Sequence, residues 1–299
     1  MGETNQSEAL YAQLCRRVFN WAKEQPSILA VIVIGSRARP ENAADEWSDL
    51  DMVLFTLDLE EYRSDPSWLQ QIGDVLLSVL DHTGRGDPEW LVVFSDGLKG
   101  DFAFTRIPEQ CRMLPALPEL LAATNFYHEA YQRGIYCLLD KTNPENEGKP
   151  IPWFHRQSAH TSQDEFQKCM NHFWMEALRA AKFIRRGDLW RAYYTCNYAM
   201  KQRVLQMAEW QAQAQHGLEY ETWYDGRYLD RWADPRLIRQ LPAAFGEYEQ
   251  SRIRAAFFNT VELFGWLALE TASALKLVYP VLIETRILEL IRATIGSVR

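Results

Sequence analysis

Two aspartates separated by a single residue open an apolar run in the stretch SDLDMVLFT, residues 48–56. Side chains alternate across a β-strand, so Asp49 and Asp51 are expected on one face, with Cα atoms about 6.5–7 Å apart. Carboxylates at this spacing repel each other unless a cation lies between them, and hard oxygen ligands in a water-accessible site suit Mg2+. Because Asp-x-Asp is also common at the solvated start of a strand, the pair alone leaves both interpretations open.

Two further features could complete a phosphate site around this pair. Gly35 and Ser36 end the preceding apolar run, where a glycine allows a tight turn that exposes backbone N–H groups and a serine hydroxyl adds another donor. Asp101 opens a later strand-like run directly after a turn, so it would lie beside the pair if the two strands are neighbours. Taken singly, these residues fit a plain strand-ending turn and a turn aspartate equally well.

The elements that must position these residues make the first half of the chain mixed α/β. A helix is expected over residues 7–24, ending before Pro26, and its apolar face carries Tyr11, Leu14, Val18 and Trp21. A second helix is expected to open at Pro66 and to cover residues 66–80. Strands are expected at residues 28–34, 50–56, 89–94, 101–107 and 134–140, with a turn at 95–100.

The second half of the chain is helical in pattern. Ser162 and Glu165 form a capping-box signature for a helix that runs to Gly187, where Asp188 is expected to cap the next helix. Further helices, which would complete a bundle, are expected over residues 189–215, about 247–277 and from 280 onwards.

These patterns predict an α+β protein with two domains. Residues 1–145 form a domain with a mixed sheet and flanking helices, and residues 161–299 form a helical domain. Residues 146–160, rich in Pro, Gly, Asn and charge, are expected to be a linker.

The composition favours a protein of the cytoplasm. The 299 residues carry a net charge of −8 at pH 7, which argues against a nucleic-acid partner and is compatible with a cationic substrate. No apolar run approaches the roughly 20 residues of a membrane span, and the start MGETNQSEAL lacks the regions of a secretion signal. The cysteines stand far apart, which predicts core thiols at Cys15, Cys111, Cys137, Cys169 and Cys196.

In combination, the residues around the aspartate pair resemble the nucleotidyltransferase superfamily typified by DNA polymerase β. The shared pattern is GS, twelve residues, DLD, and a lone strand-borne aspartate about fifty residues further on. The resemblance implies that Asp49 and Asp51 hold Mg2+ ions bridging the triphosphate, and that Asp101 completes the site and helps to deprotonate the attacking hydroxyl. The implied reaction is in-line attack of a substrate oxygen on the α-phosphorus of ATP, with pyrophosphate leaving.

Landmarks along most of the chain resemble those of the aminoglycoside 6-adenylyltransferases, the streptomycin-modifying branch. From about residue 30 to 280 they are WLVVFSDGLKGDFAF, RGIYCLLDK, SQDEFQKCMNHFW, IRRGDLWRA, VLQMAEW and GRYLDRW. The resemblance implies an N-terminal nucleotidyltransferase domain, a C-terminal helical substrate-binding domain, and transfer of AMP from Mg-ATP to the 6-hydroxyl of streptomycin. The implied partners are ATP and a cationic small molecule, without nucleic acid or membrane, and a monomer is expected.

The resemblance also assigns individual residues. It assigns the phosphate loop to Gly35 and Ser36 and the metal pair to Asp49 and Asp51. The third carboxylate is that of Asp101. Arg37 and Arg39 flank the triphosphate position and could neutralise it, although either could be a solvated loop arginine. Lys201 and Arg203, on the second bundle helix, are further candidates for contacting the nucleotide.

Glu165, Asn171 and Trp174 match the acidic, amide and aromatic landmarks of the family on the first bundle helix. Their functional interpretation is recognition of cations and hydroxyls of the substrate; the alternatives are a capping box, a polar face and a packed indole. One departure lies between them, because His172 stands where the family usually has an acid, and Met175 replaces the second tryptophan of a pair. If that acid contacts the guanidino or amino groups of streptomycin, its loss leaves the identity of the antibiotic open and does not affect adenylyl transfer.

Three alternative functions remain open from the sequence. One is adenylylation of a lincosamide, although that branch tends to carry Glu at the position of Asp101. Another is a non-catalytic partner of a toxin–antitoxin pair, although Arg156 to His160 differs from the spacing of the helical toxins. A nucleic-acid polymerase or tRNA-modifying enzyme conflicts with the net charge of −8.

Overall fold

A computed structural model describes residues 2–39, 44–107, 117, 120–121, 134–151, 161–218 and 220–296. The chain divides into two compact units, Met1–Arg156 and Gln157–Arg299, and each has hydrophobic clusters of its own. The first unit contains α1 (Gly2–Glu24), β1 (Ile28–Ile34), the 3-10 turn η1 (Gly35–Ala38), β2 (Leu50–Thr56), α2 (Leu59–Ser64), η2 (Pro66–Trp68), α3 (Leu69–Ile72), β3 (Val75–His82), β4 (Pro88–Phe94), β5 (Lys99–Arg106), β6 (Tyr136–Asp140), η5 (Pro144–Asn146) and β7 (Lys149–Pro150).

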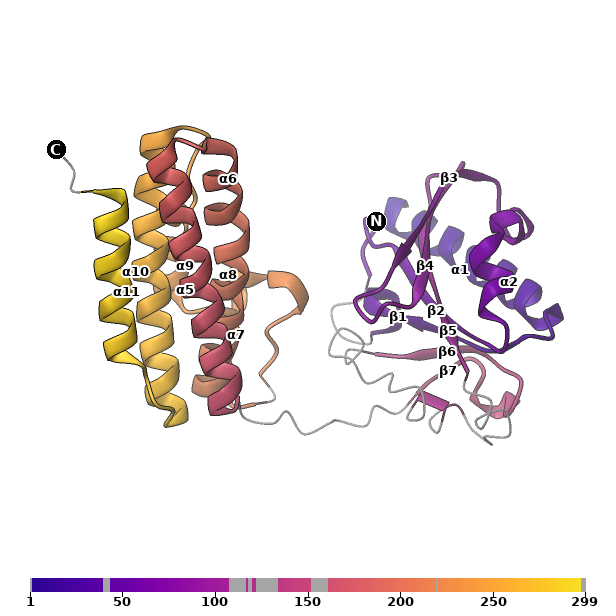
Figure 1. The fold of residues 1–299 in the computed structure, drawn as a ribbon. Coiled ribbons are helices and arrows are strands. Elements are labelled where there is room, and N and C mark those ends of the chain that lie inside the picture. The colour runs from indigo at the N-terminus through magenta and orange to yellow at the C-terminus, as the bar shows by residue number, and fades with distance from the viewer. Residues whose placement is uncertain are drawn as a thin grey trace. The chain divides into compact units, whose positions relative to one another are not determined.

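One mixed sheet organises the first unit. Among the described residues its strand order is β3-β4-β5-β2-β1-β6-β7 (Figure 1). Neighbouring strands are antiparallel except β2 and β5, which run parallel in the middle of the sheet. The five strands expected from the sequence are all present close to their expected bounds, and the turn at residues 95–98 joins β4 to β5 as a hairpin.

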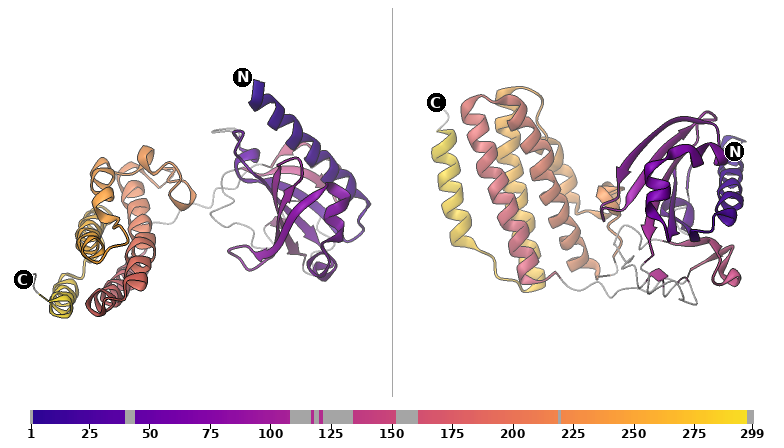
Figure 2. Two further views of the ribbon diagram at one scale, coloured as in Figure 1. Left: turned by 90° about the horizontal axis from the view of Figure 1, so that it is seen from above. Right: turned by 45° about the vertical axis from the view of Figure 1, so that its right-hand side comes forward.

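Alternate residues of the central strands enter two apolar layers on opposite faces of the sheet. Leu50 and Leu54 are fully buried in the layer that includes α1, which runs along the sheet in both views of Figure 2. Val53 and Phe55 are buried in the opposite layer. Asp51 has the parity of Val53, so it lies on the face of the sheet away from α1. The apolar face expected for α1 is confirmed, because buried positions include Tyr11, Leu14, Val18 and Trp21.

The helix expected over residues 66–80 is wrong beyond its first turns. The helical part ends with α3 at Ile72, and β3 follows as an antiparallel neighbour of β4. A Cβ at Gly73 would lie 2.5 Å from the Phe94 ring, so the glycine is needed where the chain passes from helix to strand. Both Leu77 and Val79 stay exposed on this edge strand, which explains why its apolar run lacked the period of two that marks a strand.

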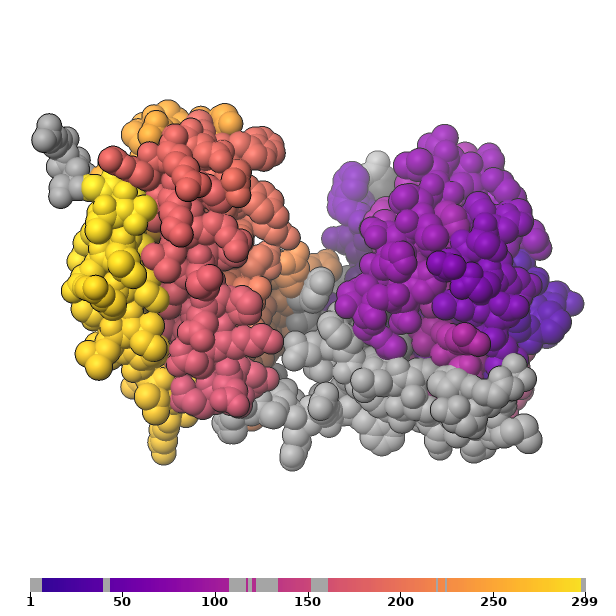
Figure 3. All heavy atoms as spheres, viewed as in Figure 1, coloured from indigo at the N-terminus to yellow at the C-terminus, as the bar shows by residue number. Residues whose placement is uncertain are grey.

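The second unit is entirely helical in the part that the structure describes. Its elements are α5 (Gln163–Arg186), α6 (Leu189–Tyr194), the π-helical segment η6 (Thr195–Ala199), α7 (Met200–His216), the 3-10 turn η7 (Tyr224–Gly226), α8 (Leu229–Trp232), α9 (Pro235–Ala244), α10 (Gln250–Leu275) and α11 (Val281–Ile295). α5 packs against α7, α10 and α11, and α10 packs against α7 and α9. Figure 3 shows α11, in yellow, on the outside of this unit, where Leu282 is 86% exposed.

The sequence signals at the ends of α5 are confirmed, with one correction. Ser162 and Glu165 form both bonds of a capping box, and Gly187 ends the helix in the left-handed region at φ +71°. Asp188 precedes α6 as expected, but its side chain does not cap that helix, and its carboxylate lies 3.7 Å from the guanidinium of Arg191. The helix expected over 189–215 is continuous, since the π-helical segment joins α6 to α7 without a break.

The structure describes part of the expected linker and four of the five cysteines. Lys149 and Pro150, inside the stretch expected as a linker, form β7 and pair with β6, whereas residues 152–160 lie outside the described residues. The thiols of Cys137, Cys169 and Cys196 are buried, that of Cys15 is half-buried, and Cys111 lies outside the described residues. Within the described part of the chain, every helix is too short or too polar to cross a membrane.

Candidate active site

The sheet register brings two of the predicted aspartates side by side. β2 and β5 are parallel, and Asp51 pairs directly with Asp101. On the other side of β2, Asp51 pairs with Ile34, the last residue of β1. Neighbouring strands in a sheet lie about 4.8 Å apart, so both carboxylates start from adjacent positions on the same face. The condition set by the sequence, that the two strands be neighbours, is met.

Gly35 follows Ile34 directly and lies against the carboxylate of Asp51. Its backbone has φ +71°, and a Cβ built on it would lie only 2.3 Å from Asp51 Oδ2. This position therefore requires glycine for two reasons, the left-handed backbone and the close approach of a charged oxygen. Ser36, the next residue of η1, is buried with 8% of its surface exposed.

Arg37 shapes the start of β2 instead of pointing freely into solvent. Its guanidinium donates to the backbone carbonyls of Ser48, at 2.7 Å, and Asp49, at 3.1 Å. The same group stacks over the ring of Tyr11 on α1, with 3.4 Å between Cζ and the ring centroid. These contacts give Arg37 a role in positioning Asp49, and they use donors that the sequence-based interpretation reserved for the triphosphate. Arg39 lies close enough to Asp51 for its charge to lower that carboxyl's pKa.

Lys99 is a site residue that the sequence interpretation missed. Its Nζ lies 2.7 Å from Asp49 Oδ2 and 3.6 Å from Asp101 Oδ2, so the ammonium joins two of the three aspartates. The signal that could have found it is the period of two, because Lys99 precedes Asp101 by two residues on β5 and therefore shares its face.

Glu89 is a second residue that the sequence interpretation missed. On β4 it pairs with Ala103 of β5, two positions along from the pair of Leu91 and Asp101, so it lies on the same face as the aspartates. Burial, and then the charges of Asp101, Asp51 and Asp81, raise the pKa of Glu89 to about 7. The buried alternation of Trp90, Val92 and Phe94 in EWLVVF could have placed Glu89 on this face.

The aspartates show the effects of crowding in a partly buried place. Burial is the main cause that raises the pKa of Asp51 to about 6, followed by the charges of Asp101 and Asp49, while Lys99 and Arg39 act in the opposite direction. Burial likewise raises the pKa of Asp101 against the lowering effect of Lys99. The neighbouring carboxylates add to the effect of burial on both groups, because Asp49 raises the pKa of Asp51 and of Asp101.

The donor set of this face fits Mg2+. All the donors are carboxylate oxygens, which a hard divalent cation prefers, and Asp101 Oδ1 is buried without a hydrogen-bond partner. In the arrangement described, the ammonium of Lys99 already pairs with Asp49 and Asp101. No three His, Cys, Asp or Glu side chains of the described ranges form a ready ligand set, so binding an ion here requires these side chains to move.

Comparison with known proteins decides the family. The family model described as streptomycin adenylyltransferase matches residues 10–293. The chain belongs to the streptomycin adenylyltransferase family. It is 24% identical over 272 residues to an aminoglycoside 6-adenylyltransferase of Campylobacter jejuni, covering 88% of each chain. It is 22% identical over 274 residues to the enzyme of that name from Bacillus subtilis, covering 87% of this chain and 89% of the other.

A solved structure of an aminoglycoside 6-adenyltransferase from Bacillus subtilis also matches this family member. The match covers 95% of this chain and 98% of the chain in that structure, with 18% identity and a TM-score of 0.45. The family is one of nucleotidyltransferases, and the fold class expected from the sequence, a mixed-sheet domain followed by a helical one, is the one observed.

The helical unit of this streptomycin adenylyltransferase family member buries Lys201 inside its packing. The ammonium donates to the carbonyl of Cys196, at 2.9 Å, and to Thr260 Oγ1, at 2.7 Å, and it lies 4.9 Å from the ring centroid of Phe245. Burial lowers the pKa of Lys201 to about 8. Lys201 therefore lies near the start of α7, and its ammonium joins the π-helical segment at Cys196 to α10 at Thr260. Its contact with the nucleotide stays a prediction. Arg203 donates to Gln206 on its own helix.

The three residues predicted to bind substrate on α5 do not lie together. Glu165 is exposed and accepts bonds from the backbone and hydroxyl of Ser162, which lower the pKa of its carboxyl. Trp174 is only 2% exposed and packs edge-on against Phe173 and Phe264 in the core of the unit. Of the two interpretations given for Trp174, the structure shows the packed indole, because the ring faces the bundle interior.

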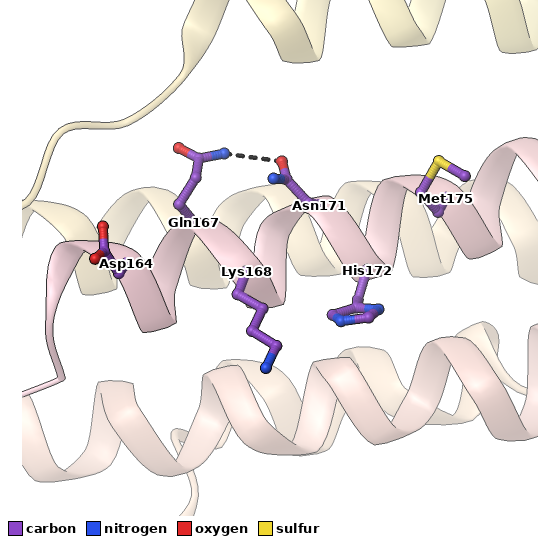
Figure 4. A pocket seen from close by; sticks show the side chains of 6 residues that line it. All are labelled: Asp164, Gln167, Lys168, Asn171, His172 and Met175. Atoms are coloured by element: carbon purple, nitrogen blue, oxygen red, sulfur yellow. Dashed lines mark hydrogen bonds between the residues drawn. The ribbon is translucent and has the colours of Figure 1, made fainter.

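A hollow along the exposed side of α5 contains the remaining predicted residue. Asn171 lines it, and its side-chain oxygen accepts a bond from Gln167 at 2.9 Å (Figure 4). The hollow measures about 440 Å³, and its lining includes His172 and Met175, the two positions that depart from the family pattern. In Figure 4, His172 and Lys168 extend from one side of the helix, and Gln167, Asn171 and Met175 from the other.

Proposed function

We propose that this protein transfers AMP from ATP to a hydroxyl of an aminoglycoside and thereby inactivates the antibiotic. The observation that carries the proposal is the pairing of Asp51 with Asp101, with Gly35 against Asp51, in a chain that matches the streptomycin adenylyltransferase family over residues 10–293. The aminoglycoside 6-adenylyltransferases of Campylobacter jejuni and Bacillus subtilis indicate the class of acceptor. Among these acceptors we propose streptomycin, modified at its 6-hydroxyl, and we place the reaction in the cytoplasm, where ATP is available.

The residues of the sheet face divide the chemistry among them. The acceptor oxygen forms a bond to the α-phosphorus of ATP while the bond from that phosphorus to the bridging oxygen breaks, and pyrophosphate leaves. Asp101 Oδ1, which has no hydrogen-bond partner in this structure, is the proposed acceptor of the hydroxyl proton. Asp49 and Asp51 would hold Mg2+, which neutralises the triphosphate when bound. Gly35 and Ser36 would present backbone N–H groups to the phosphates.

The helical unit is the proposed source of contacts to the aminoglycoside. The hollow on α5 offers hydroxyl-binding groups at Asn171 and Gln167 and a carboxylate at Asp164, and the net charge of −8 favours a polycationic ligand. His172 replaces the acid that the family usually carries at this position. We therefore expect the acceptor range to be the property in which this protein differs most from its relatives.

Purified protein with Mg-ATP and streptomycin should release pyrophosphate and yield a drug heavier by one adenylyl group, measured by mass spectrometry. A panel of aminoglycosides, with a lincosamide included, identifies the acceptor from the same pyrophosphate readout. Turnover on streptomycin confirms the specific proposal, and turnover on another member of the panel corrects the acceptor. Absence of pyrophosphate release with every compound, from folded protein, would refute the proposed function.

The two interpretations of Glu165 predict different results for one conservative substitution. Glutamine can replace glutamate in a capping box, so Glu165→Gln should keep the helix start and remove only the charge. Because the carboxylate is engaged by Ser162, we expect the KM for the aminoglycoside to be unchanged in Glu165→Gln. Ser162→Ala is the matched variant and should lower the free energy of unfolding by about 1 kcal/mol, measured by urea denaturation. A raised KM in Glu165→Gln with unchanged stability would assign Glu165 to the substrate after all.

A further inference from the structure

The ammonium of Lys99 occupies the middle of the aspartate cluster. Its Nζ contacts Asp49 Oδ2 at 2.7 Å and Asp101 Oδ2 at 3.6 Å. Lys99 is the first residue of β5, directly after the hairpin turn, and its parity on the strand places it on the face of Asp101. A single side chain therefore joins one carboxylate from the start of β2 to another from β5.

Charge balance explains why a cation is needed at this point. Three carboxylates on neighbouring strand positions repel one another, and the repulsion is strongest where they are partly withdrawn from water. Asp101 is the more buried partner of Lys99, with 19% of its side chain exposed, and its second oxygen has no hydrogen-bond partner. Without a metal ion, Lys99 supplies the positive charge that keeps Asp49 and Asp101 turned towards each other.

Because of the same contacts, Lys99 competes with a divalent ion for carboxylate oxygens. An ion held by Asp49 and Asp51 needs the Asp49 oxygen that the ammonium contacts at 2.7 Å, and two cations cannot share that oxygen at ligand distance. The Lys99 side chain is 41% exposed and flexible, so it can withdraw into solvent when the ion arrives.

We propose that Lys99 is a positioning residue that holds Asp49 and Asp101 in the metal-free protein and that a divalent cation must displace it to bind. This inference rests on the proposed metal role of the aspartates. It makes metal loading a competition between one internal cation and one external cation. Removing the internal cation should then strengthen metal binding, an effect that a merely structural lysine would not produce.

The test measures the binding of Mn2+ alone, without nucleotide, to the full chain at pH 8. The readout is the loss of the free-ion signal in electron paramagnetic resonance. Lys99→Gln should bind Mn2+ about two- to fivefold more tightly than the wild type, the range expected for removing a partly exposed competing charge. Lys99→Arg keeps the charge and should bind as weakly as the wild type. Lys149→Gln removes an exposed charge from β7, at the far side of the sheet from β5, and is the matched control.

Each outcome has a distinct meaning. Tighter binding in Lys99→Gln alone supports the competition, and so does binding that appears in Lys99→Gln when the wild type shows none. Equal or weaker binding in Lys99→Gln, with binding by the wild type, overturns the role of Lys99 and leaves the proposed function intact. Absence of Mn2+ binding in all four proteins overturns the competition together with the metal role of the aspartates. Circular dichroism of each variant separates these results from a failure to fold.

Discussion

Asp51→Asn is expected to lower the rate of adenylyl transfer by about 10²- to 10³-fold or more, the usual cost of removing one preorganised charged group from an active site. Asp51 is the carboxylate that pairs with Asp101 across β2 and β5 and lies against Gly35. Asparagine has nearly the same shape but lacks the negative charge that would hold a divalent cation. The measurement is pyrophosphate release under saturating Mg-ATP and acceptor, with folding checked by circular dichroism.

The same substitution is expected to stabilise the fold in the absence of metal. The pKa of the Asp51 carboxyl is raised from its ordinary 3.8 to about 6, chiefly by burial. Between these two values the folded protein retains a proton that the unfolded chain has released, so this group's contribution to stability falls as the pH rises. Above about pH 6 the full cost remains, and Asp51→Asn removes it. At pH 8 without Mg2+, we expect the variant to gain on the order of 1–3 kcal/mol in free energy of unfolding.

A control variant separates this effect from a general change of charge. Asp230 is exposed on α8 in the helical unit, and Asp230→Asn changes the net charge by the same amount. It should leave both the rate and the pH dependence of unfolding unchanged. An Asp51→Asn protein that keeps near-normal turnover would contradict the metal role. An Asp51→Asn protein that is less stable than the wild type at pH 8 without Mg2+ would contradict the destabilising effect of burying the charged Asp51 carboxylate.

The alternation of side chains made much of the site predictable. Because Leu50, Met52 and Leu54 had to be buried, Asp51 had to face the other side, and the structure confirms this division. The position of Asp101 depended on which strands are neighbours, which a single sequence does not contain. The family pattern supplied that information indirectly, since a third carboxylate at this distance is only useful if β5 lies beside β2.

Sequence reasoning was least informative where tertiary packing outweighs local pattern. Trp174 and Lys201 look like binding residues by type, yet both side chains are buried against α10, a contact that only the assembled bundle defines. Lys99 was missed for the opposite reason, because a lysine after a turn is usually solvated and only the approach of β2 brings Asp49 within 2.7 Å of it. The end of the helix at Gly73 was also missed, because the need for glycine there comes from the ring of Phe94, which packs against it only in the folded chain.

Gly35→Ala is expected to impair both activity and stability, through one new methyl group. A left-handed backbone costs a non-glycine residue about 1–2 kcal/mol, and the wild-type φ at this position is +71°. The added Cβ would stand 2.3 Å from Asp51 Oδ2, a distance that forces the carboxylate or the turn to move. Misplacing a reacting group by about 1 Å can cost about 10²-fold in rate, so we expect a loss of that order in pyrophosphate release.

Gly86 provides the control that isolates the contact with Asp51 from the backbone cost. It has φ +85° in the turn between β3 and β4, and a Cβ there would meet no atom within 4 Å. Gly86→Ala should therefore lose about 1–2 kcal/mol of stability, as Gly35→Ala does from its backbone alone, and keep normal turnover. Equal activity in the two variants would show that the turn at Gly35 is only a strand end. A loss confined to Gly35→Ala would connect the glycine to the carboxylate that it touches, because only there does the new methyl group displace a charged oxygen.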